Sequence, residues 1–204
     1  FTNLIDVCIL VSLIFLVHVF GLKLAAKYYG TELKIKIWNS QKFKDANTFA
    51  KKLLLIYTTP ILNILFMLFS NGRIFLSSVF SFNVKKEVLG RRFQYITYFN
   101  IASIVFFGLL FNLILMWIFK LTNIDIGLKI SFWFILFNLL PISELPGAKL
   151  LAGSITFYIF NVIFFLVNII LLRVISSFSA LFLSLLFSVI TAALYFFFFQ
   201  YKRA

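Results

Sequence analysis

The chain has 204 residues, of which 63% are hydrophobic and only six are acidic. A soluble domain of this length has about half of its residues apolar, so composition excludes a soluble globular protein and requires lipid as solvent. The net charge of +13 is the excess of Lys and Arg that membrane proteins gather in cytoplasmic loops, and we expect no nucleic-acid partner. The single cysteine, Cys8, excludes an intrachain disulfide and a cysteine metal cluster.

Apolar runs within the length range of a spanning helix, about 17–25 residues, indicate the fold class. They cover 4–22, 99–119, 127–143, 154–172 and 178–199. The stretch 53–84 is interrupted by Ser70-Asn71-Gly72-Arg73, and its second part is too short to cross. We therefore predict an all-α polytopic membrane protein, a single domain over 1–204, with five spanning helices and a re-entrant hairpin at 53–84. If 53–69 crosses alone, there are six spanning helices.

The loops 23–52 and 85–98 carry most of the basic residues between spans. Both obey the positive-inside bias only if the chain between them enters the membrane and returns to the same side. We therefore expect an outside N-terminus, with the basic loops and the C-terminus in the cytoplasm, in a prokaryotic plasma membrane. The alternative, in which 53–69 is an ordinary span, places the basic residues of 85–98 outside.

Residues Thr31–Trp38 alternate strictly between polar and apolar side chains. This period of two predicts a short strand, which we place at the membrane interface with Leu33, Ile35 and Ile37 on one face. The alternative is a basic amphipathic segment that only touches anionic lipid headgroups.

Two segments depart from plain apolar helix. The first contains the only histidine, in His18-Val19-Phe20-Gly21-Leu22, followed by Ala25, Ala26, Lys27 and Gly30. The second is Phe137-Asn138-Leu139-Leu140-Pro141-Ile142-Ser143-Glu144-Leu145-Pro146-Gly147, which breaks a span with two prolines. The charge-based topology places both segments at the cytoplasmic edge.

These segments resemble motifs of the site-2 protease family of intramembrane zinc metalloproteases. The family's first core helix carries His-Glu-x-Gly-His, and a later one carries Phe-Asn-Leu-Leu-Pro-Ile-x-x-Leu-Asp-Gly-Gly. A weaker match lies between them, at Gly108-Leu109-Leu110-Phe111-Asn112-Leu113. The order is correct, and the resemblance covers about residues 10 to 170.

The resemblance implies a lost active site. A catalytic zinc needs about three protein ligands, a water and a carboxylate base. The family's two His, Glu and Asp correspond here to His18, Leu22, Val19 and Pro146. We expect no catalytic residues, no metal and no cofactor. His18 is interpreted as an interior histidine bonded to a backbone carbonyl or to Glu144, and a His18–Glu144 pair is a candidate structural latch.

The leading interpretation is a non-catalytic member of this family, a pseudoprotease that binds other membrane proteins as a structural or assembly subunit. We expect its partner to offer a transmembrane segment and to contact Asn112, Asn138 and the strand positions Leu33, Ile35 and Ile37, and we expect lipid as the other partner. Two alternatives are an active metalloprotease with an altered site that uses Glu144, and a small transporter or channel-like protein.

Overall fold

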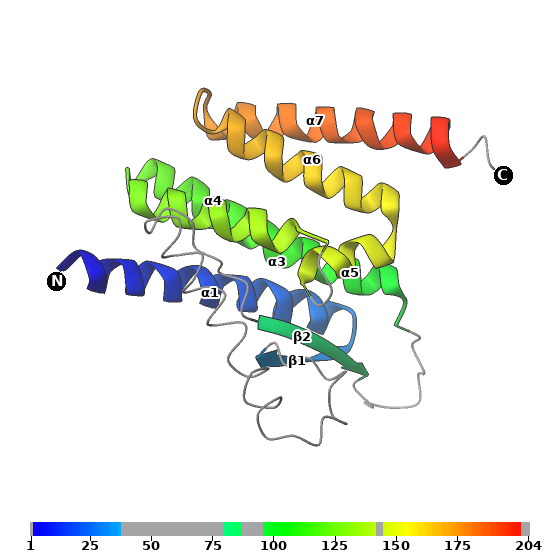
Figure 1. The fold of residues 1–204 in the computed structure, drawn as a ribbon, viewed down its shortest axis with the longest axis horizontal. Helices are drawn as coiled ribbons and strands as arrows, with labels where there is room; N and C mark the ends of the chain where they lie inside the picture. The colour runs from blue at the N-terminus through cyan, green and yellow to red at the C-terminus, as the bar shows by residue number, and fades with distance from the viewer. Residues whose placement is uncertain (1, 38–79, 87–95, 142–144, 201–204) are drawn as a thin grey trace, which may run out of the picture.

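The computed structural model describes residues 2–37, 80–86, 96–141 and 145–200. Within these ranges six α-helices and one two-stranded sheet form the molecule, which confirms the all-α class (Figure 1). The helices are α1 (Thr2–Tyr28), α3 (Tyr98–Leu121), α4 (Asp125–Leu139), α5 (Pro146–Gly153), α6 (Ile155–Leu171) and α7 (Ser177–Tyr195), and a π-helical turn, η2 (Phe196–Gln200), follows α7.

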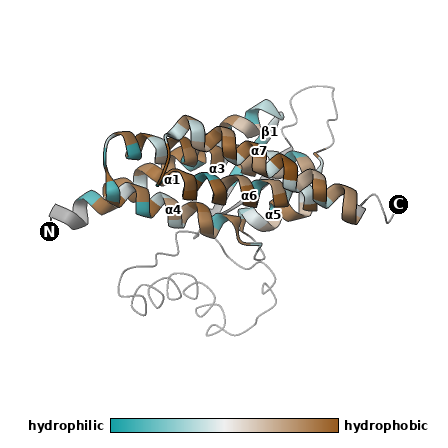
Figure 2. Ribbon diagram, turned by 90° about the horizontal axis from the view of Figure 1, so that it is seen from above, coloured by the Kyte–Doolittle hydropathy of each residue, from teal (hydrophilic) through white to brown (hydrophobic). Residues whose placement is uncertain are grey.

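Three helices are long and apolar enough to cross a membrane, which supports an integral membrane protein. They cover Asp6–Tyr28, Tyr98–Leu121 and Ser177–Phe199. At 1.5 Å per residue, the 24 residues of α3 extend about 36 Å, more than the roughly 30 Å hydrocarbon core. Helix α6 is apolar and has 17 residues, at the lower limit for a span. Figure 2 shows hydrophobic residues along all of these helices.

The predicted span 127–143 is partly wrong. Helix α4 ends at Leu139 after 15 residues, about 22 Å. The reason is local, because Pro141 disfavours helical backbone at Leu140, which is extended with ψ of 132°. A helix that we did not predict, α5, follows the break and has Pro146 in its first turn, where a proline costs no hydrogen bond.

Helices α1 and α3 form an antiparallel pair. Leu22 of α1 packs against Gly108 of α3, and His18, one turn earlier on α1, contacts Asn112, one turn later on α3. A Cβ at Gly108 would lie 2.7 Å from Leu22 Cδ2, so the missing side chain lets the two helices approach closely.

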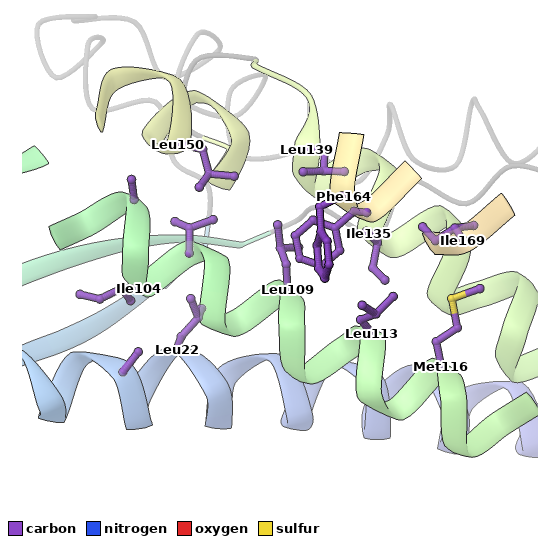
Figure 3. Packing of buried hydrophobic residues seen from close by; sticks show 14 of the residues in the cluster. Leu22, Ile104, Leu109, Leu113, Met116, Ile135, Leu139, Leu150, Phe164 and Ile169 are labelled. Atoms are coloured by element: carbon purple, nitrogen blue, oxygen red, sulfur yellow. The ribbon is translucent and has the colours of Figure 1, made fainter. Parts of the chain in front are cut away.

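The hydrophobic core surrounds α3. Figure 3 shows side chains of α1, α4, α5 and α6 meeting those of α3. Its labelled members include Leu22, Leu109, Leu113, Ile135, Leu150 and Phe164, all of which are buried. Burial of each such side chain stabilises a fold in water by about 1.5–3 kcal/mol, but inside a bilayer the same contacts act mainly through close packing.

The predicted strand at Thr31–Trp38 is confirmed over Thr31–Ile37 as β1. Its partner was not predicted. Strand β2 (Phe80–Lys86) pairs with it antiparallel, with Thr31 opposite Lys86 and Ile37 opposite Phe80. Residues 80–84, which we expected in the re-entrant hairpin, belong to this strand, and the alternation of Phe80, Phe82 and Val84 favours it. The rest of the expected hairpin, 53–79, lies outside the described residues, as does Trp38.

The end of α1 and the start of α3 lie at the same end of the bundle, because the two helices are antiparallel and β1 pairs with β2 close to the end of α1 (Figure 1). Helices α4, α6 and α7 then alternate in direction, and the two chain termini lie at opposite ends.

Candidate functional site

His18 occupies the junction of α1, α3 and α4. Its side chain is only 5% exposed, and the Nδ2 amide of Asn112 donates to its Nδ1 at 3.1 Å. The ring also lies against Gly108, since a Cβ at that position would be 3.1 Å from the imidazole Cε1. Phe134 of α4 lies edge-on to the imidazole, with ring centroids 5.1 Å apart. Because an amide nitrogen only donates, Nδ1 accepts and the ring proton resides on Nε2.

Sequence analysis gave two expectations for His18, an interior position and a latch with Glu144. The interior position of His18 agrees with its burial, and its hydrogen-bond partner is the Asn112 side chain, 94 residues away, which was not foreseen. The proposed latch with Glu144 stays a prediction, since residues 142–144 lie outside the described residues.

Asn112 is fully buried, and its Oδ1 has no hydrogen-bond partner in the described part of the chain. A polar side chain without partners is costly inside a membrane. The hydrogen bond from the Asn112 amide nitrogen to His18 offsets part of this cost and joins α1 to α3. The expected role of Asn112 in partner binding stays a prediction; in the structure its amide faces His18.

The other positions of the first motif hold no ligating or proton-transferring group. Leu22, which the motif resemblance aligns with a histidine, is 3% exposed and packs against Gly108. Val19 is half-buried, and a Cβ at Gly21 would lie 3.0 Å from Phe111. Aliphatic side chains at positions 19 and 22 pack helices and bind neither protons nor metal ions.

The second motif forms the break between α4 and α5. Asn138 is buried, and its Nδ2 donates to the Phe134 carbonyl at 2.8 Å. Pro141 is exposed, whereas Pro146 and Gly147 are buried at the start of α5. The expected contact between Asn138 and a partner stays a prediction.

Gly147 has a structural reason to be glycine. A Cβ at this position would lie 2.4 Å from the carbonyl oxygens of both Leu139 and Leu140. These are among the last carbonyls of α4, which have no partner within their own helix. The Tyr158 hydroxyl of α6 donates to the Leu139 oxygen at 3.1 Å. Sequence analysis missed Tyr158, because a tyrosine in an apolar run gives no signal of its distant partner.

A set of hydrogen-bonded polar side chains on α3, α6 and α7 was also missed. Trp117 Nε1 of α3 donates to Asn168 Oδ1 of α6 at 3.2 Å, and Asn168 Nδ2 donates to Ser184 Oγ of α7 at 3.0 Å. The chain of hydrogen bonds joins three helices inside the apolar bundle. Asn168 lies within an apolar run of the sequence, and a polar residue inside a membrane needs a partner. Its position could therefore have indicated a contact between helices.

Strand β1 begins directly beyond α1. The Thr31 hydroxyl donates to the Ala26 carbonyl at 3.0 Å, and Gly30 makes the turn with a φ of 62°, a left-handed conformation that glycine adopts freely. Leu33 is half-buried against the core. Ile35 and Ile37, two further expected partner-binding positions, lie in β1 opposite Phe82 and Phe80.

Within the described ranges no three His, Cys, Asp or Glu residues lie together in a group that would hold a metal ion. The sequence matched no protein-family model, no curated protein and no solved structure.

Proposed function

We propose that this chain is a non-catalytic membrane scaffold of the site-2 protease type, which binds an extended segment of another membrane protein. The proposal has two parts, the absence of catalytic chemistry at the motif positions and the presence of a surface suited to a partner. The motif similarity to the family supports the first part, and the β1–β2 ribbon supports the second.

The first part rests on residue chemistry. A zinc hydrolase needs a base and a set of ligands converging on one water. At the corresponding positions Val19, Leu22 and Pro146 are aliphatic. His18, the one surviving ligand type, accepts a hydrogen bond from Asn112 through Nδ1 and lies against Gly108. Both features suit an imidazole that joins helices.

The surface suited to a partner is inferred from the β1–β2 ribbon, whose outer strand edges are unpaired within the described residues. Strands β1 and β2 form a two-stranded sheet, and no third strand within the described residues pairs with either. A strand at a sheet edge presents unpaired N–H and C=O groups to any extended chain, and an isolated pair of strands gains stability from a third. Strand addition is a known mode of peptide recognition.

We place the ribbon at the cytoplasmic surface of a prokaryotic plasma membrane, with the N-terminus outside. The support is charge, since the described residues around the end of α1 and the sheet include Lys23, Lys27, Lys34, Lys85 and Lys86, and cytoplasmic loops carry such an excess. A partner segment at this surface would continue from its own transmembrane helix.

The first experiment is a tagged purification from native membranes in mild detergent, followed by quantitative mass spectrometry. A partner at constant ratio is expected, and its retention should depend on the ribbon edge. In an antiparallel strand the N–H groups of successive residues point to opposite sides. Proline has no N–H group, so one of the variants Lys34→Pro and Ile35→Pro removes a donor at the outer edge of β1. The other variant removes a donor that faces β2.

The outward variant is expected to lose the partner while the protein keeps its elution profile. The matched control is an exposed position away from the ribbon, Lys129→Ala, which should retain the partner. Undiminished retention in both proline variants, or copurification of no protein at fixed ratio, would refute the scaffold proposal. Peptide-bond cleavage by the purified chain would refute the non-catalytic part.

A further inference from the structure

The ribbon has two chemically different faces. Side chains alternate along a strand, so Glu32, Lys34 and Lys36 belong to one face of β1, and Leu33, Ile35 and Ile37 to the other. Leu33 packs against the core of the bundle, whereas Glu32 and Lys34 are exposed. At the described side chains the apolar face, at Leu33, lies toward the helices, and the charged face, at Glu32 and Lys34, lies away from them.

Pairing with β2 extends this charged face. Lys85 is opposite Glu32, Asn83 is opposite Lys34, and Ser81 is opposite Lys36. Glu32 thus has a basic residue across the strand pair, while the two positions across from Lys34 and Lys36 are neutral. On this face, where Lys85 is opposite Glu32, the excess positive charge lies at the Lys34 and Lys36 positions of β1.

Lys34 is available for a new partner. Its Nζ lies 3.9 Å from Glu32 Oε2, and both side chains are about half exposed. An ion pair of this length and exposure is worth at most about 1 kcal/mol, so an incoming carboxylate competes with it easily. Directly opposed charges on neighbouring strands attract, and like charges repel.

From this arrangement we propose that the partner segment is an acidic strand that adds to the outer edge of β1. It alternates apolar residues, which continue the bundle-facing side, with Asp or Glu at the two positions opposite Lys34 and Lys36, and it has no acidic residue opposite Glu32. The inference rests on the proposed function, since it names the chemistry of the segment that the scaffold binds.

The test uses two fluorescently labelled peptides and the full chain in an uncharged detergent. Both peptides alternate valine with polar residues; one has glutamate at two successive polar positions, and the other has lysine there. Binding is measured by fluorescence anisotropy. Replacing two attractive pairs by two repulsive ones changes affinity by about tenfold or more, so the glutamate peptide is expected to bind at least about tenfold more tightly.

The double substitution Lys34→Glu and Lys36→Glu should reverse this preference. Lys23→Glu with Lys27→Glu is the matched control, because it makes the same change of charge at exposed positions of α1 and should leave the preference unchanged. A reversal in the first variant alone supports the proposal. An equal effect of both variants overturns it, since general charge attraction would then be the cause.

The remaining outcomes distinguish failure of the acidic preference from failure of the proposed scaffold function. Equal binding of both peptides overturns the acidic preference and leaves strand addition standing. Binding of neither peptide overturns both. A parallel measurement compares retention of the protein on phosphatidylcholine vesicles with and without phosphatidylglycerol. If Lys34→Glu with Lys36→Glu changes retention on the anionic vesicles only and leaves the peptide preference unchanged, the ribbon binds lipid headgroups. The proposal is then wrong.

Discussion

Gly147→Ala should destabilise the break between α4 and α5 more than any other single-methyl change in the second motif. The added Cβ would lie 2.4 Å from two carbonyl oxygens, those of Leu139 and Leu140. Real Cβ atoms do not come closer than 3.0 Å to such atoms, so the backbone of α5 or of the α4 terminus must move by more than half an ångström. Neither contact is with a flexible side chain that could rotate away.

The magnitude follows from three terms. Overpacking of this kind costs about 1–3 kcal/mol. Displacement of the Leu139 carbonyl weakens the hydrogen bond from Tyr158, at 3.1 Å, which is worth about 0.5–1.5 kcal/mol. Replacing glycine by alanine inside a helix returns at most about 1 kcal/mol. The net loss is about 1–3 kcal/mol, or a shift of the apparent unfolding midpoint by several degrees.

The assay is thermal unfolding of the detergent-purified chain, followed by size-exclusion chromatography after heating. Ala152→Ser, at an exposed position of the same helix, is the matched control and should leave the midpoint near the wild-type value. A Gly147→Ala protein that unfolds at or above the wild-type temperature would refute the packing argument, because it would mean that α5 does not rest on those carbonyls.

Two further substitutions test the polar contacts that hold the helices and the ribbon. Asn168→Leu keeps the side-chain volume but removes the hydrogen-bond partner of both Trp117 and Ser184. We expect the free energy of unfolding to fall by about 1–2 kcal/mol and the fluorescence of Trp117 to change. An unchanged emission spectrum would refute the contact. Thr31→Val removes the hydroxyl donor to Ala26 at nearly constant shape; we expect about 1 kcal/mol and faster amide hydrogen exchange in β1 than in wild type, whereas equal exchange would show that the bond does not anchor the ribbon.

Local patterns in the sequence were enough to predict the helices and one strand. A helix spans a membrane because a continuous stretch is apolar, and such stretches are visible in 99–119 and 178–199 without knowledge of neighbours. The alternation from Thr31 to Ile37 predicted β1 for the same reason. The proline at 141 also signalled a break, although the predicted span extended to residue 143 and α4 ends at Leu139.

Two elements were missed although local signals existed. Pro146 in the first turn of α5 is a typical helix start, and the alternation of Phe80, Phe82 and Val84 is typical of a strand. Both signals were hidden, because a long apolar stretch around each one was assigned to a single spanning or re-entrant element. In an apolar chain, hydropathy alone does not separate a strand from part of a membrane-inserted element.

The sequence by itself determined the all-α membrane class, the long apolar helices and the amphipathic strand. Only the tertiary structure decided what the polar residues within the helices do. It pairs His18 with Asn112 across 94 residues, sets Gly147 against the α4 carbonyls and gives β1 its partner strand. The physical reason is that hydropathy is a property of one segment, whereas a hydrogen bond or a close backbone contact needs two segments whose meeting depends on how the whole bundle packs.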